Sequence, residues 1–99
     1  MITEIIKDSL RENLKGLGIN VLTDQISLER PANRDHGDWS SNIALVTAKD
    51  AGRQAKGLAE EIVNSLTTNL PNGITEVTAA GPGFINFRVS AELSYGIVL

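Results

Sequence analysis

Cysteine is absent from this 99-residue sequence, and histidine occurs once, as His36. Without thiols the chain can form neither a disulfide nor a thiolate metal site, and a single imidazole excludes a histidine-rich metal site. This composition is compatible with a reducing cytoplasmic location. The sequence also lacks a run of about 18 apolar residues, which a membrane-spanning helix requires. Charges interrupt the apolar positions of residues 1–13, so no signal peptide is expected.

Basic residues are fewer than acidic ones, nine against twelve, and the formal net charge is −3. This balance argues against a free-standing, nonspecific nucleic-acid binder. The basic residues are nevertheless concentrated in the middle of the chain, where segment 30–56 contains Arg30, Arg34, Lys49, Arg53 and Lys56. A locally positive segment can orient a polyanion towards one face of a protein. A solvated loop and helix surface explains so small a bias equally well.

The hydrophobic periodicity predicts a single domain over residues 1–90 with alternating helices and strands. We expect helices over 2–17, about 39–49 and about 54–68, and strands over 25–29, 74–79 and 84–90. Residues 91–99 look like the start of a further helix. The last two strands are joined by Gly81-Pro82-Gly83, a sequence typical of a tight turn. The predicted fold class is therefore α+β, with two layers and a small antiparallel sheet that helices cover on one face.

The strand over 84–90 has two faces of different chemistry. Ile85, Phe87 and Val89 are uniformly apolar and should pack on the helices, because side chains alternate along a strand. The opposite face carries Phe84, Asn86, Arg88 and Ser90. An aromatic ring stacks on unpaired bases, an amide both donates and accepts hydrogen bonds, and a guanidinium contacts phosphate. Alternation alone favours a structural interpretation, in which Phe84 packs under a loop or another domain and Asn86 and Arg88 are ordinary solvent-facing residues.

The segment "RDHGDW" contains His36 and Asp38, which could be taken for an acid–base pair. A general base also needs a pocket and an aimed proton, so we favour a structural interpretation. Gly37 sets a turn, Asp38 or Ser40 caps the helix that follows, and His36 hydrogen-bonds within the loop. We predict Trp39 in the core or at an interface. No catalytic residue and no metal site are predicted.

Two longer segments carry a family resemblance: "LERPANRDHGDWSSNIALVTAK" and "ITEVTAAGPGFINFRV". Together they resemble the N-terminal domain of bacterial arginyl-tRNA synthetases, essentially from end to end. The residues that carry the resemblance are Pro31, His36-Gly37-Asp38, Asn42-Ile43-Ala44, Lys49 and the run Gly81 to Phe87.

The resemblance implies an aminoacyl-tRNA synthetase domain that contacts the tRNA elbow and reads the D-loop, including an unpaired base. By position, the aromatic and amide that make this contact in relatives are Phe84 and Asn86. Some relatives use an amide where this chain has Gly81, so one base-edge contact differs here. The His36-Gly37-Asp38 triplet holds its loop against the sheet in the family. We expect Arg30, Arg34 and Arg88 to contact the RNA as well.

The parent enzyme implied by the resemblance is a cytoplasmic ligase of protein biosynthesis, which binds ATP, Mg²⁺, arginine and its cognate tRNA. Its class I catalytic signature contains two histidines and cannot occur in this chain. We therefore expect a non-catalytic, monomeric tRNA-binding domain, with residues 91–99 leading towards a catalytic domain. The alternative is a protein-interaction or structural domain that uses the same strand face without RNA.

Overall fold

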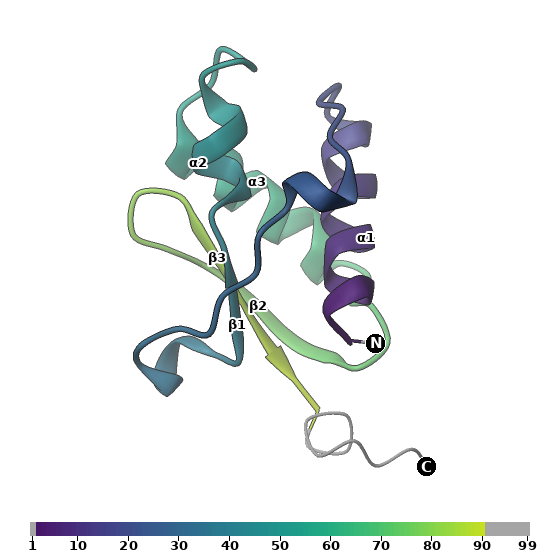
Figure 1. Cartoon of the computed structure of the whole chain (residues 1–99), viewed down its shortest axis with the longest axis vertical. Coiled ribbons are helices and arrows are strands. Elements are labelled where there is room, and N and C mark those ends of the chain that lie inside the picture. Colours follow the sequence, from purple (N-terminus) through teal and green to yellow (C-terminus); the bar gives the residue numbers. More distant parts are fainter. Residues whose placement is uncertain (1, 91–99) are drawn as a thin grey trace.

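The computed structural model describes residues 2–90, and the predicted helix at 91–99 lies outside the described residues. Within this range the chain forms three α-helices and a three-stranded antiparallel sheet, so the predicted α+β class is confirmed (Figure 1). The elements are α1 (Ile2–Gly16), a 3₁₀ turn (Thr23–Gln25), a second 3₁₀ turn (Arg34–His36), β1 (Trp39–Ser41), α2 (Ile43–Ala48), α3 (Ala55–Thr67), β2 (Ile74–Ala80) and β3 (Phe84–Val89). No helix in this range is both long and apolar enough to cross a membrane.

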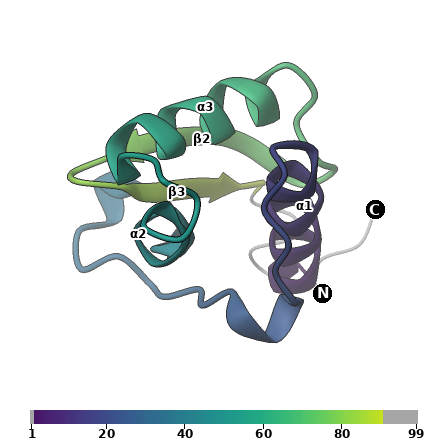
Figure 2. The same ribbon diagram turned by 90° about the horizontal axis from the view of Figure 1, so that it is seen from above.

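Two amphipathic helices build most of the helical layer. Ile6, Leu10 and Leu14 of α1 are fully buried, and so are Leu58 and Ile62 of α3. Their 3–4-residue spacing places them on one stripe of each helix, which explains why both helices form where the periodicity predicted them. Helix α1 packs on α3, whereas α3 and α2 contact the sheet directly. Figure 2 shows α3 lying along β2 and α2 beside β3.

The strand order is β1-β3-β2, so β3 is hydrogen-bonded on both sides. Its apolar residues Ile85, Phe87 and Val89 are buried against the helices, as predicted. The turn that leads into β3 packs closely as well. A Cβ atom on Gly83 would lie 2.9 Å from the Cβ of Ala55 and 3.1 Å from the Cγ of Leu45, so only glycine fits beside α2 and α3.

The predicted strand over 25–29 is wrong. Residues 23–25 form a 3₁₀ turn instead, closed by a hydrogen bond of 2.8 Å from the Leu22 N–H to the Gln25 side chain. Only Glu29 reaches the sheet, as an isolated antiparallel bridge to Ser40. The side chain of Gln25 satisfies the backbone locally, which removes the need for a strand partner at this point.

The boundary of the second helix was also predicted wrongly. Residues 39–41 form β1 along the free edge of β3, and α2 begins only at Ile43. Neither Asp38 nor Ser40 is its N-cap. That position belongs to Asn42, and the Ser41 hydroxyl accepts a 3.2 Å hydrogen bond from the Ile43 N–H. The open edge of β3 offers ladder hydrogen bonds that outweigh the local helical preference of these residues.

Candidate nucleic-acid interface

The strand register defines an outer face of the sheet, opposite the helices. Phe84, Asn86 and Arg88 alternate with the buried residues of β3 and therefore share this face. Ser40 of β1 and Thr78 of β2 are the direct partners of Asn86. Directly paired residues of an antiparallel sheet point to the same side, so both hydroxyls flank the carboxamide.

The Phe84 ring lies at one end of the outer face and is 40% exposed. It borders a slot of about 30 Å³ whose other walls are Ser27, Glu29, Ser40 and Asn42. A Cβ atom on Gly81 would lie 3.6 Å from Cδ2 of this ring, at ordinary contact distance. Glycine therefore leaves the turn side of the ring uncovered, and a polar slot adjoins another side.

Asn86 is not presented to solvent as the alternation suggested. Its exposed fraction is only 4%, because β3 is the central strand and both neighbouring strands carry side chains up to it. Among residues 2–90 the carboxamide has no side-chain hydrogen bond. Asn86 is thus a recessed polar group with unused hydrogen-bonding capacity, and buried amides normally find a partner.

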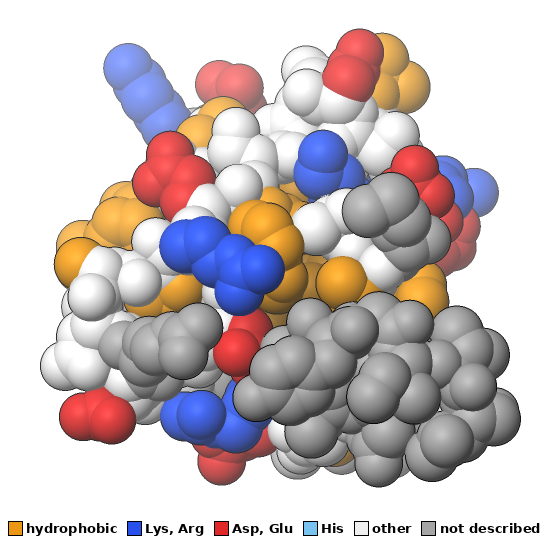
Figure 3. All heavy atoms as spheres, turned by 60° about the horizontal axis from the view of Figure 1, so that its bottom comes forward, with side chains coloured by type: hydrophobic (Ala, Val, Ile, Leu, Met, Phe, Trp, Pro, Cys, Tyr) orange, Lys and Arg blue, Asp and Glu red, His pale blue; other side chains and the backbone are white. Residues whose placement is uncertain are grey.

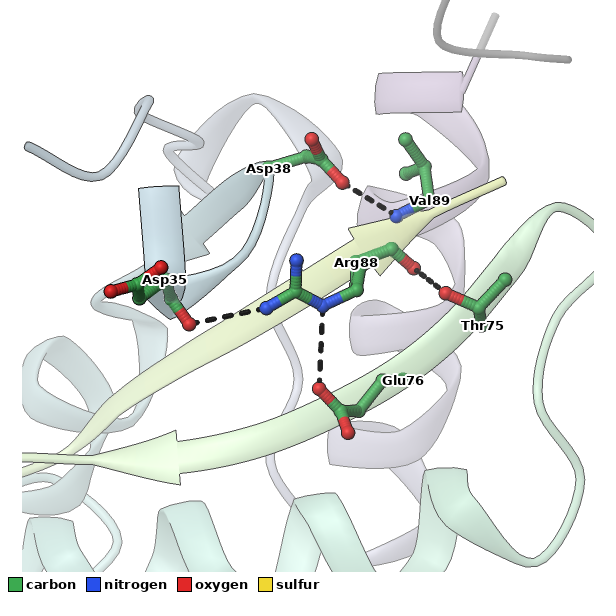
Figure 4. Close-up of polar contacts among 6 residues, drawn as sticks. All are labelled: Asp35, Asp38, Thr75, Glu76, Arg88 and Val89. Carbon is green, nitrogen blue, oxygen red and sulfur yellow. Dashed lines mark hydrogen bonds and ion pairs between the residues drawn. The ribbon is translucent and has the colours of Figure 1, made fainter. Parts of the chain in front are cut away.

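Arg88 is engaged within the protein (Figure 4). Its Nη2 donates a 3.1 Å hydrogen bond to the backbone carbonyl of Asp35, and its Nε lies 3.5 Å from a carboxylate oxygen of Glu76. The side chain remains 44% exposed. An exposed ion pair of this kind contributes at most ~1 kcal/mol, so the pair does not prevent the guanidinium from also meeting a phosphate.

The loop before β1 is fixed to β3 by Gly37 and Asp38. The Asp38 N–H donates a 2.7 Å hydrogen bond to the Phe87 carbonyl, and the Asp38 carboxylate accepts one of 2.9 Å from the Val89 N–H. Gly37 has φ of +111°, and a Cβ there would lie 2.7 Å from the Phe87 carbonyl oxygen. Asp38 therefore joins this loop to the end of β3 and does not cap a helix. The His36 backbone N–H bonds the carbonyl of Asn33, and its side chain is exposed.

Arg30 lies apart from Phe84. Its guanidinium carbon is 4.2 Å from the centroid of the half-buried Trp39 ring, a cation–π arrangement. Trp39 pairs with Phe87 on the side of the sheet opposite Asn86, so the stack lies along the sheet edge. Arg34 is in the second 3₁₀ turn of the same loop region. The structure therefore brings Phe84, Asn86 and Arg88 together on one face but does not add Arg30 to them.

Charge on the molecule is mixed. On the face shown in Figure 3, basic and acidic side chains are interspersed, with no continuous patch of one sign. Within the described residues, no group of three or more His, Asp or Glu side chains is placed to hold a metal ion. The face shown in Figure 3 therefore offers no extended positive surface for bulk attraction of a polyanion.

Residues 4–89 match the model of a known family, described as the arginyl tRNA synthetase N terminal domain. The chain belongs to this family. It is 41% identical over 90 residues to an arginine–tRNA ligase of Paenarthrobacter aurescens and 39% identical over 90 residues to that of Pseudarthrobacter chlorophenolicus. Each match covers 91% of this chain and 16% of the relative, so the chain spans about a sixth of the length of these enzymes.

Solved structures support the fold of this arginyl-tRNA synthetase N-terminal domain. An arginyl-tRNA synthetase of Thermus thermophilus superposes with a TM-score of 0.77 at 22% identity, over 94% of this chain and 15% of that one. The arginyl-tRNA synthetase of Plasmodium falciparum superposes with a TM-score of 0.69 at 20% identity, over 93% of this chain and 16% of that one. These structures agree with the predicted fold, and the match to the family model over residues 4–89 confirms the family predicted from the motifs.

Sequence reasoning missed part of this surface. Glu29, Ser40 and Thr78 lie in line with Asn86, and Trp39 supports Arg30. The alternation of Glu76, Thr78 and Ala80 in β2 was visible in the sequence and could have placed Thr78. Glu29 and Ser40 gave no such signal, because neither lies in a strand long enough to show alternation.

Proposed function

We propose that this domain binds the arginine-accepting tRNA through the outer face of its sheet and contacts the D-loop at the elbow. The observation that carries the proposal is the position of Phe84. A 40% exposed aromatic ring stands on a sheet face beside a polar slot. The same strand carries a recessed carboxamide that makes no side-chain hydrogen bond within residues 2–90. Single-stranded RNA loops are commonly read by aromatic stacking combined with hydrogen bonds to base edges.

Each outer-face residue has a distinct part in this proposal. An unpaired base stacks on Phe84, which leaves its edge over the slot and the carboxamide of Asn86. The guanidinium of Arg88 lies further along β3 and meets the RNA backbone, with Arg30 and Arg34 contacting phosphates from the edge. Gly81 keeps the turn side of the ring free, so recognition there depends on shape more than on a hydrogen bond.

The domain acts by positioning and carries out no chemistry of its own. We propose that it works as part of a longer arginine–tRNA ligase, a cytoplasmic monomer in which ATP and Mg²⁺ serve a separate catalytic domain. With a net charge of −3, the domain alone should bind tRNA weakly, because a partial interface still bears the entropic cost of association.

An NMR titration of the ¹⁵N-labelled chain with the arginine-accepting tRNA tests the proposal. Amide shifts should concentrate at the start of β3, at Gly81 and in β1, and they should weaken as salt rises. A tRNA specific for another amino acid serves as the control and should cause smaller shifts. Shifts confined to the helical layer, with β3 unchanged, would contradict the proposal and support a protein-docking domain instead.

A further inference from the structure

We propose that Glu29 is a specificity residue of this interface, which selects a base with an exocyclic amine. The inference rests on the proposed function and extends it to a residue outside the strand that carries Phe84. It concerns which base is preferred when one stacks on Phe84 with its edge towards the slot, whereas the proposed function concerns whether RNA binds to this face at all.

The backbone register places Glu29 in line with Asn86. Glu29 and Ser40 exchange two backbone hydrogen bonds, of 2.9 and 2.8 Å, and Ser40 in turn pairs with Asn86, which pairs with Thr78. Residues that pair directly across antiparallel strands share a face. Four polar side chains from four adjacent segments therefore form one row across the outer face: Glu29, Ser40, Asn86 and Thr78.

Phe84 lies beside this row. It lines a slot of about 30 Å³ together with Ser27, Glu29, Ser40 and Asn42. Phe84 and Glu29 are therefore two walls of the same slot. A base stacked on the ring would therefore direct its edge towards the Glu29 end of the polar row.

Two members of this polar row, Glu29 and Asn86, have free hydrogen-bonding capacity. Glu29 is exposed, and among residues 2–90 its carboxylate has neither an ion pair nor a hydrogen bond. Asn86 is 4% exposed and its carboxamide is also without a side-chain partner in that range. A carboxylate has only acceptors, whereas a carboxamide has both donors and acceptors.

The acceptors of Glu29 decide which base fits. Cytosine, adenine and guanine each present an exocyclic amine that can donate to a carboxylate, and carboxylates recognise the cytosine N4 amine in this way. Uracil carries the carbonyl oxygen O4 where cytosine has its amine, and its one donor on this edge, N3–H, is flanked by two carbonyl oxygens that would also face the carboxylate. A phosphate group would be repelled by the negative charge of the Glu29 carboxylate, so this position favours a base edge over the RNA backbone.

Two short RNAs, the hexanucleotides rC6 and rU6, test this contact, because cytosine and uracil have the same ring size and differ only in the C4 substituent and the N3 proton. We expect the unaltered chain to bind rC6 roughly fivefold more tightly than rU6, measured by NMR titration at fixed salt. Glu29→Gln, which restores a donor facing the uracil carbonyl, should remove this preference. Glu76→Gln is the matched control. It neutralises a carboxylate on the same face, in β2 two residues before Thr78, and it should leave the preference intact.

The possible outcomes separate the inference from the proposed function. If the unaltered chain binds rC6 and rU6 equally well and Phe84→Ala binds neither, the role of Glu29 is overturned and the RNA-binding face remains. A Glu29→Gln variant that binds both RNAs more tightly, with the ratio unchanged, would show simple charge repulsion and also overturn it. Absence of β3 shifts with these RNAs and with tRNA would overturn the proposed function and this inference together.

Discussion

The Asp38 carboxylate accepts a 2.9 Å hydrogen bond from the backbone N–H of Val89, 51 residues later in the chain. One residue earlier, Gly37 presses against the carbonyl of Phe87. These contacts fix the loop before β1 to the far end of β3, so the polar loop that sequence inspection could mistake for a catalytic motif is part of the sheet scaffold (Figure 4).

Replacing Asp38 with alanine should destabilise the domain by ~1–3 kcal/mol, because the Val89 N–H loses its acceptor in a partly buried position. Urea denaturation of the variant measures the free energy of unfolding. Asp35→Ala is the control, since only backbone atoms of Asp35 enter the contacts of this loop, and it should change the free energy by much less. Equal losses in the two variants would contradict the role assigned to the Asp38 carboxylate.

Gly37→Ala should destabilise the domain by at least ~1–3 kcal/mol, the usual cost of a non-glycine residue at such a backbone conformation. The new methyl group would in addition lie 2.7 Å from the Phe87 carbonyl oxygen. Gly57→Ala is the opposite control. It lies within α3 with no atom within 4 Å of the added Cβ, and should raise the free energy of unfolding by ~0.5–1 kcal/mol. Thermal or urea unfolding of both variants measures this contrast, and a tolerated Gly37→Ala would show that the loop can move off β3.

Phe84→Ala should weaken tRNA binding by ~1–3 kcal/mol if one base stacks on the ring. The fold should persist, because the ring is 40% exposed and outside the buried core. Val46→Ala, at a 56% exposed position on α2, is the matched control and should leave tRNA affinity unchanged. Titration of each variant with tRNA gives the dissociation constants, and an unchanged constant for Phe84→Ala would remove stacking from the mechanism.

Gly81→Asn should strengthen tRNA binding by adding a carboxamide beside the Phe84 ring, where the proposed complex places the edge of a base. The backbone there has φ of +56°, a conformation that asparagine tolerates better than most residues, and the added Cβ meets only the edge of Phe84 at 3.6 Å. Gly81→Ala provides the Cβ without the amide and is the control. Equal affinities for the two variants, measured by titration at one salt concentration, would show that no base edge comes within reach of this turn.

The long, periodic elements could be predicted from the sequence, and the short ones could not. Helices α1 and α3 and the β2–β3 hairpin are specified by local spacing and by the glycine-rich turn, and the family follows from motifs that span the whole chain. Strand β1 has three residues, and the edge of β3 decides its conformation. The burial of Asn86 depends on the order β1-β3-β2, which no local pattern contains. The same order brings Glu29 and Ser40 beside Asn86, so the polar row was not visible before the register was known.

Strand β3 is held by a ladder on each side, and Asp38 secures its last residue. In the proposed complex, an RNA loop would meet a strand whose backbone is already in its final arrangement. The conformational freedom lost on binding would then fall mainly on the RNA, and discrimination between loops would reflect how readily each one can splay a base outward.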